Sequence, residues 1–412
     1  MFSLTSSFLV SAIFLLFPAA IPACPTIPDL ASYNNTALPD PFTFADGSKV
    51  VTLADWACRR AEISTLLQLD ELGVLPDDPE SMVATFSGTT LNITVTDGGK
   101  SISFAPTITF PKTGTAPFPA LIAMGGISIP SPAGVAIINF NNEQMANQDS
   151  SPASRGVGLF FNLYGSDASA GAMIAWAWAV RRIMDALEQT PATRINTARV
   201  GVSGCSRNGK GALVAGAFEP RLVLTIPEES GSGGTDSWRI SDFILASGIS
   251  TQTASEIVQE NVWLGTAFDQ FANTSVDALP FDHHLLGAMV APRGLFVIDN
   301  VGYYMASVVM RFRGSDSFLR IDWLGPFSSF GAMVSARAAW TAMQASDSFG
   351  ISQAANHSHC AFPASQQTQL NAFINKFLFD EAGDTGVVET AGNYTFTVPD
   401  AQWAPWSVPT LV

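Results

Sequence analysis

The chain has 412 residues, of which 47% are hydrophobic and 13% charged, and its formal net charge is −15. This composition excludes intrinsic disorder, because a chain so apolar and so weakly charged can bury a large core. The 20 Lys and Arg residues are scattered and form no basic stripe, so we expect no nucleic-acid partner.

Residues 1–23 have the pattern of a secretory signal peptide. An apolar run from Phe8 to Phe17, interrupted by Ser11, leads into small residues and proline before Ala23. The run is shorter than the roughly 20 apolar residues that span a bilayer, which argues against a membrane anchor. No Lys or Arg precedes the run, which departs from the usual pattern. We therefore expect a secreted, extracellular protein that makes no membrane contact.

If the protein is secreted, its cysteines and its Asn-x-Ser/Thr triplets can be interpreted as disulfides and glycosylation sites. The four cysteines are expected to form disulfides, since the extracellular environment is oxidising. Asn-x-Ser/Thr triplets become candidate glycosylation sites. They lie at Asn34, Asn92, Asn273 and Asn393, with a fifth triplet at Asn356.

Residues 24 to about 110 are predicted to form an N-terminal region of short strands. Apolar and β-branched residues lie between turn signals at 82–86, 91–95 and 102–104.

From residue 118 onward the chain shows continuous apolar runs, which are typical of strands buried on both faces of a parallel sheet. Apolar residues at helical spacing occupy 170–187 and 366–379. This alternation predicts right-handed βαβ units in one α/β domain over residues 24–412. The predicted buried strands are 120–124, 135–140, 199–202, 222–226, 294–298 and 349–353.

The stretch 199–213 contains the candidate nucleophile, Ser206. A buried strand enters a turn flanked by glycine and then a helix of small residues, as in the nucleophile turn of α/β-hydrolases. The backbone N–H after the serine and the helix dipole would then face a developing oxyanion. Asn208 stands where the second glycine usually lies, so a phosphate-binding or merely structural turn stays open. The sequence has no G-x-x-x-x-G-K-[ST] motif to support phosphate binding.

Four histidines are available as the base. In α/β-hydrolases the base follows the last strand. His283 and His284 precede the strand 294–298, so we interpret them as packing residues. His357 and His359 follow the apparent last strand, where the base is expected.

The cysteines favour His359 over His357. If Ser206 and His359 lie within hydrogen-bond reach, then Cys205 and Cys360 come into the Cα spacing of roughly 5.5–6 Å that a disulfide needs. The remaining pair, Cys24–Cys58, would tie the N-terminus to the domain. Four cysteines allow three pairings, so Cys205–Cys360 and Cys24–Cys58 are inferences.

Two carboxylates are candidates for the acid that orients the histidine. Glu229 follows the predicted strand 222–226, and Asp299 follows the strand 294–298. Either strand end could direct a carboxylate at the imidazole, and either residue could instead be a solvated loop carboxylate. The residue pattern alone leaves the choice open.

Over nearly the whole chain after the signal segment, the sequence resembles the fungal 4-O-methyl-glucuronoyl methylesterases of carbohydrate esterase family fifteen. The element from Gly204 to Gly211, Gly-Cys-Ser-Arg-Asn-Gly-Lys-Gly, is specific to that family and accounts for the unusual turn. The other matching stretches are 164–166, 169–173, 176–178, 227–234, 238–241, 281–284, 291–295 and 357–360.

The resemblance implies an α/β-hydrolase fold, a three-layer sandwich with a mainly parallel central sheet. It also implies particular roles for eight residues. These are Ser206 as nucleophile, Glu229 as acid, His359 as base, Arg207 at the oxyanion, and Lys210, Gln252, Glu260 and Trp323 on the glucuronate hydroxyls and 4-O-methyl group.

Two departures from the family pattern stand out. A third disulfide that members often carry is missing, because its expected positions are Ser237 and a residue near Ala332. About twenty extra residues, 301–320, separate the strand at 294–298 from the segment around Trp323. We hypothesise that this segment is a retained intron in the gene model, and the alternative is a genuine surface loop. A spliced transcript that still encodes 301–320 would exclude the intron.

The predicted activity is hydrolysis of esters of 4-O-methyl-D-glucuronic acid in glucuronoxylan, including its links to lignin, by a monomer. The alternatives are another secreted ester hydrolase such as a feruloyl or acetyl xylan esterase, a serine peptidase, or a non-catalytic wall-binding protein. We expect no cofactor and no metal, because no cluster of ligand residues has metal-site spacing.

Overall fold

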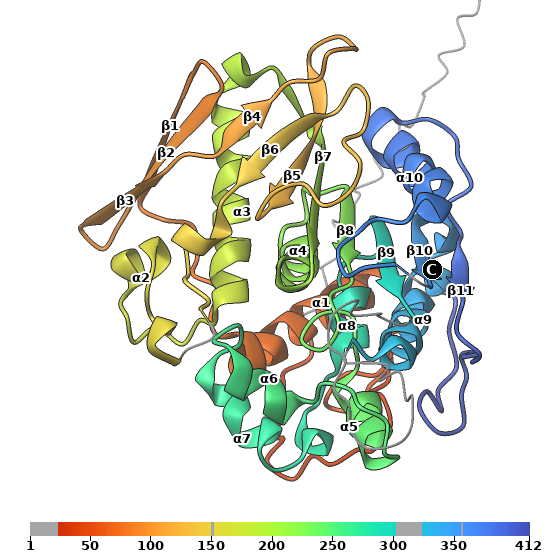
Figure 1. Cartoon of the computed structure of the whole chain (residues 1–412). Helices are drawn as coiled ribbons and strands as arrows, with labels where there is room; N and C mark the ends of the chain where they lie inside the picture. Colours follow the sequence, from red (N-terminus) through yellow and green to blue (C-terminus); the bar gives the residue numbers. More distant parts are fainter. Residues whose placement is uncertain (1–23, 150–151, 302–323, 356) are drawn as a thin grey trace, which may run out of the picture.

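The computed structural model describes residues 24–149, 152–301, 324–355 and 357–412 (Figure 1). The predicted signal segment 1–23, nearly all of the extra segment 301–320, Trp323 and the triplet at Asn356 lie outside the described residues.

In the described part of the chain the strands form one eleven-stranded sheet. Its order is β1-β2-β4-β6-β5-β7-β8-β9-β10-β11, with β3 paired to β2. The strands are β1 Ser81–Ser87, β2 Thr90–Asp97, β3 Lys100–Phe104, β4 Thr107–Thr109, β5 Phe118–Met124, β6 Ala136–Phe140, β7 Ile195–Cys205, β8 Leu224–Glu228, β9 Gly294–Asn300, β10 Phe349–Ala354 and β11 Val388–Thr390.

The sheet is parallel from β6 through β11 and antiparallel at its β1–β4 end. Its parallel part is buried on both faces, as the continuous apolar runs predict. In β9, for example, Leu295 and Val297 pack into one core cluster, whereas Phe296 and Ile298 pack into the other.

Helices cover both faces, which gives the predicted three layers (Figure 1). Helix α10 packs on one face, against β5, β7, β8 and β9, whereas α3, α4 and α9 pack on the other. The helices are α1 Leu53–Leu67, α2 Leu159–Tyr164, α3 Ala172–Gln189, α4 Arg207–Phe218, α5 Trp238–Ala246, α6 Ala254–Glu260, α7 Asp269–Ala272, α8 His283–Ala288, α9 Pro326–Ala342 and α10 Gln367–Phe379.

The N-terminal region differs from the prediction of short strands alone, because it contains the 15-residue helix α1. A capping box formed by Thr52 and Asp55 starts this helix. Its buried face includes Trp56 and Ile63, seven positions apart. The Thr-x-x-Asp spacing is a sequence signal that could have identified this helix.

Two predicted strand ends also need correction. The predicted strand 222–226 lies two residues later, as β8, and ends at Glu228. The predicted strand 294–298 continues as β9 to Asn300, so Asp299 lies within a strand and not after it. The short β11 follows α10, so β10 is not the last strand.

Candidate active site

Ser206 lies at the junction between β7 and α4, where its backbone adopts φ 59° and ψ −127°. Non-glycine residues rarely adopt a positive φ, and a serine that does so between a strand and a helix is the signature of a nucleophile turn. The Ser206 N–H donates to the carbonyl of Glu228 at 2.9 Å, which fixes the turn to the neighbouring strand. The Ser206 side chain is only partly buried, so its hydroxyl can meet a substrate.

Two glycines allow the strand and the helix to come this close. A Cβ on Gly204 would lie 2.4 Å from the carbonyl oxygen of Asn208, and one on Gly209 would lie 2.7 Å from that of Glu228. Only glycine fits at either position without displacing backbone. Glycine therefore stands on both sides of the serine where the strand and the helix approach each other, with Gly209 as the second glycine in place of Asn208.

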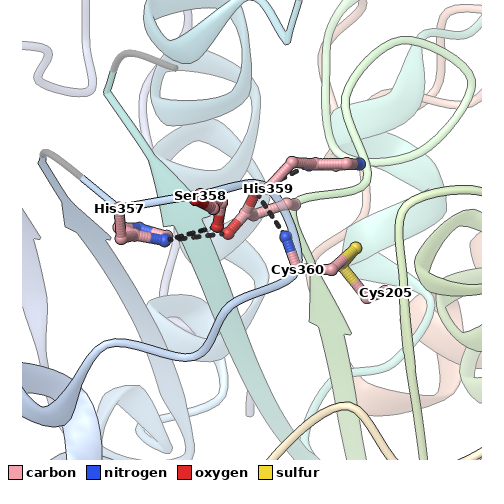
Figure 2. Close-up of a disulfide and its surroundings, with 6 residues drawn as sticks. Cys205, His357, Ser358, His359 and Cys360 are labelled. Carbon is pink, nitrogen blue, oxygen red and sulfur yellow. Dashed lines mark hydrogen bonds and ion pairs between the residues drawn. A yellow bond between two sulfur atoms is a disulfide. The ribbon is translucent and has the colours of Figure 1, made fainter. Parts of the chain in front are cut away.

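Glu229 and His359 form the contact expected of an acid and a base. His359 Nδ1 lies 2.7 Å from Glu229 Oε2, and the Cys360 N–H donates to the same oxygen at 3.2 Å (Figure 2). A carboxylate only accepts hydrogen bonds, so Nδ1 carries the hydrogen and Nε2 is the ring nitrogen that would act as base. Glu229 is fully buried, and its own N–H donates to Ile298 at 2.8 Å.

A disulfide between Cys205 and Cys360 joins the residues adjacent to Ser206 and His359, with a Cα–Cα distance of 5.8 Å. A ring nitrogen of His359 and both sulfurs lie within 4.8 Å of one another. Because the two sulfurs are bonded to each other, this trio offers no thiolate to a metal. The disulfide instead holds the loop that contains His359 against the end of β7. The second predicted disulfide, Cys24–Cys58, also forms and joins the N-terminal segment to α1.

Asp299, the other candidate acid, is bonded elsewhere. Its Oδ2 accepts from the side-chain amide of Gln353 at 2.9 Å, and its Oδ1 accepts from the Asn300 N–H at 2.9 Å. Burial raises the pKa of Asp299 to about 6, against the effect of these hydrogen bonds. Among the described contacts of His359, the carboxylate partner is Glu229.

His283 and His284 are buried packing residues, as interpreted from the sequence. His283 lies between the Gly234 carbonyl and the Glu71 carboxylate, at 2.6 Å from each. His284 Nε2 lies 2.7 Å from the carbonyl of Pro39. The contact to Gly234 supports the loop that follows Glu229.

Lys210 lies one helical turn after Ser206, with only 3% of its surface exposed. Its ammonium donates to the carbonyls of Ser230 and Ser232, both at 2.5 Å. Burial lowers the pKa of Lys210 to about 8, although the charges of Asp236 and Glu260 oppose this. Lys210 therefore connects α4 to the loop after Glu229.

Gln252 and Glu260 lie together, as the predicted sugar subsite requires. The Gln252 amide donates to Glu260 Oε2 at 2.7 Å, and the Ser232 hydroxyl donates to the Gln252 carbonyl at 2.5 Å. These contacts connect both residues to the loop that Lys210 holds. The fourth predicted subsite residue, Trp323, lies outside the described residues.

Trp263 was not predicted from the sequence. Its ring lies under two cations of α4, with Lys210 Nζ at 5.2 Å from the ring centroid and Arg207 Cζ at 5.9 Å. It is 2% exposed. A lone tryptophan 53 residues after Lys210 has no spacing signal that could have identified it, and the fold brings it there.

The model of a family described as glucuronyl esterase, fungi, matches residues 93–344. The chain belongs to the fungal glucuronyl esterase family. A 4-O-methyl-glucuronoyl methylesterase of Hypocrea jecorina (strain QM6a) is 51% identical over 389 residues, which are 94% of this chain and 79% of that protein. The family membership that the resemblance predicted is confirmed, and with it a carboxylic-ester hydrolase activity.

Solved structures of glucuronyl esterases agree with the fold. The glucuronoyl esterase catalytic domain of Hypocrea jecorina has a TM-score of 0.85 and 50% identity, covering 95% of this chain and 100% of that one. A mutant of the Sporotrichum thermophile glucuronoyl esterase, in complex with methyl 4-O-methyl-β-D-glucopyranuronate, has a TM-score of 0.83 and 45% identity, covering 92% and 97%. The predicted α/β-hydrolase fold is thereby confirmed.

Proposed function

We propose that this protein is a secreted serine esterase that hydrolyses esters of 4-O-methyl-D-glucuronic acid in glucuronoxylan, including those to lignin alcohols. The observation that carries the proposal is the contact of 2.7 Å between His359 and Glu229. The loop of His359 is joined by a disulfide to Cys205, the residue before Ser206. The names of the relatives and the glucuronate methyl ester bound to one of them support the choice of substrate.

In the proposed reaction, the Ser206 hydroxyl oxygen attacks the ester carbonyl carbon while its proton passes to His359 Nε2. The intermediate then releases the alcohol, which takes that proton, and leaves an acyl-enzyme. Water attacks the acyl-enzyme with its proton going to His359, and the glucuronic acid leaves as Ser206 regains a proton. Glu229 holds the Nδ1–H and stabilises the imidazolium.

We propose that one group of residues stabilises the oxyanion and that another recognises the sugar. The first N–H groups of α4 and the Arg207 side chain would face the negative charge on the carbonyl oxygen. Lys210, Gln252, Glu260 and Trp323 would hold the sugar hydroxyls and the 4-O-methyl group. Hydrogen bonds link Lys210 to Gln252 through Ser232, and Gln252 to Glu260 directly, which supports a polar subsite beside the loop that follows Glu229.

The decisive experiment measures hydrolysis of a benzyl glucuronate ester by the wild type and by Ser206→Ala. We expect the variant to lose turnover and to keep its affinity for the sugar. Ser203→Ala is the matched control, because Ser203 lies on β7, which leads into Ser206, is fully buried, and has a hydroxyl without a hydrogen-bond partner among the described residues. Full turnover by Ser206→Ala would refute the nucleophile, and absence of turnover in the wild type would favour a non-catalytic wall-binding protein.

Substrate preference separates this proposal from other hydrolases on the same fold. Glucuronate and galacturonate esters differ in the hydroxyl arrangement at one carbon, so a site built for glucuronate should hydrolyse the first with a higher kcat/KM. Equal rates on both, or faster cleavage of feruloyl or acetyl esters, would favour a feruloyl or acetyl xylan esterase. Amide cleavage at a comparable rate would favour a peptidase.

Secretion is proposed from the pattern of residues 1–23 together with two structural observations. Both disulfides suit an oxidising compartment, and the side chains of Asn34, Asn92, Asn273 and Asn393 are exposed as glycosylation would require. Among the described residues, no helix combines the length and the apolarity that crossing a bilayer demands. Mass spectrometry of the protein from a culture medium would test the removal of the first 23 residues and the glycans.

A further inference from the structure

The carboxylate of Glu229 lies between two histidines, one on each oxygen. His359 Nδ1 lies 2.7 Å from Oε2, and His357 Nδ1 lies 3.4 Å from Oε1 (Figure 2). Glu229 is fully buried, and the His357 side chain is 10% exposed. The mechanism uses the first of these contacts and leaves the second unexplained.

The surroundings of His357 determine which of its nitrogens carries hydrogen. Nδ1 faces two acceptors, the Ser358 carbonyl at 3.1 Å and Glu229 Oε1 at 3.4 Å. Neither oxygen can donate, so Nδ1 must be the donor. Its hydrogen bond goes to the Ser358 carbonyl, and Glu229 Oε1 is the next acceptor beside the same N–H. The distance to Oε1 is longer than a well-formed hydrogen bond, as is common for catalytic contacts before substrate binds.

The two oxygens of Glu229 are unequally supported. Oε2 meets both His359 and the N–H of Cys360, whereas Oε1 makes no well-formed hydrogen bond with any described residue. The last torsion of a glutamate side chain is broad, so one-sided support leaves the carboxylate able to rotate. The His357 N–H is the donor that the described part of the chain places beside this oxygen, at 3.4 Å.

His357 is itself held in place from the sheet. Its carbonyl accepts from the side-chain amide of Asn300, at the end of β9, at 3.2 Å. A donor fixed to the sheet in this way can orient another side chain.

We propose that His357 is a positioning residue for the esterase: its Nδ1–H holds Oε1 of Glu229 so that Oε2 stays directed at His359. The proposal rests on the proposed roles of Glu229 and His359. His357 contacts neither the nucleophile nor the substrate in this role, and it acts through the carboxylate alone.

The test compares two variants of similar polarity. In His357→Asn the amide nitrogen can occupy the place of Nδ1, whereas in His357→Gln it reaches the place of Nε2. We expect kcat on a benzyl glucuronate ester to fall roughly 10- to 100-fold in the Gln variant, the range known for loss of the hydrogen-bond partner that orients a metal-bound histidine. We expect KM to stay within about twofold. The Asn variant should recover most of this loss. Equal kcat for the two variants, or a wild-type kcat for the Gln variant, would overturn the proposal.

A second comparison excludes a merely structural effect. In the Glu229→Gln background, His357→Gln should cause little further loss of kcat, because the carboxylate that it orients is gone. A loss of the same factor in both backgrounds would show that His357 acts independently of Glu229 and would overturn the proposal. If Glu229→Gln alone keeps the wild-type kcat, the triad itself is wrong. If Glu229→Gln is impaired while His357→Gln is not, only this inference fails.

Discussion

Replacing Glu228 by Gln is expected to remove a loss of stability that the wild type suffers as the pH rises. Glu228 ends β8 opposite Cys205 of β7, with its side chain fully buried. Neither of its carboxylate oxygens makes a well-formed hydrogen bond in the described part of the chain. Burial raises the pKa of Glu228 from 4.5 to about 7; the nearby Ser128 hydroxyl opposes this rise, and the charge of Glu229 adds to it.

The sign and size of the effect follow from this pKa. Between pH 4.5 and 7 the folded protein keeps a proton on Glu228 that the unfolded chain has already released. Stability from this group is therefore complete below pH 4.5 and falls as the pH rises to about 7. Since a tenfold change in proton affinity equals about 1.4 kcal/mol, the full loss is about 3 kcal/mol. A glutamine of the same shape cannot ionise and does not show this loss.

Urea unfolding of the wild type and Glu228→Gln at pH 4 and pH 8 measures the difference. From the lower to the higher pH, the variant should gain about 3 kcal/mol in free energy of unfolding relative to the wild type. Asp299 and Asp242 have pKa values that burial raises to about 6, but they titrate in both proteins and cancel in the comparison. Glu80→Gln, at an exposed position, is the control for the chemical change. The same pH dependence in Glu228→Gln and wild type would refute the reasoning.

Two further predictions concern the proposed triad. Replacing Cys205 and Cys360 by Ser should lower the free energy of unfolding by roughly 2–5 kcal/mol. It should also lower kcat, because the loop that contains His359 is released. An unchanged urea midpoint would contradict the stabilising role of this disulfide. Asp299→Asn should keep kcat within a few-fold of the wild-type value, whereas Glu229→Gln should lower kcat roughly 10³- to 10⁴-fold. A comparable loss of kcat in both variants, measured by steady-state kinetics, would mean that the acid is misassigned.

The parts of the fold that the sequence predicted are those with a strong local pattern. The strand at 120–124 is continuous and apolar because both of its faces are covered, and it appears as β5. The strand–turn–helix around Ser206 was predicted because the turn needs glycine at fixed positions, which leaves a visible motif. In both cases the physical requirement acts on residues close together in the chain.

The choice between Glu229 and Asp299 could not be made from the residue pattern. A strand end displaced by one residue directs the next side chain to the other face of the sheet. Because β8 stops at Glu228 while β9 continues through Asp299, one carboxylate turns to the histidine and the other stays in the sheet. The resemblance to a family of known fold was needed to favour Glu229.

The proposed active site concentrates backbone strain that the surrounding structure must hold. Ser206, Glu229 and Cys360 all adopt a positive φ, at 59°, 42° and 59°. Such conformations cost of order 1–3 kcal/mol each and persist only where neighbouring contacts fix them. Here Ser206 donates to β8, Glu229 donates to β9, and the disulfide of Cys360 returns to β7. Three adjacent strands thus hold the three strained residues, of which Glu229 contacts His359 and Cys360 directly follows His359.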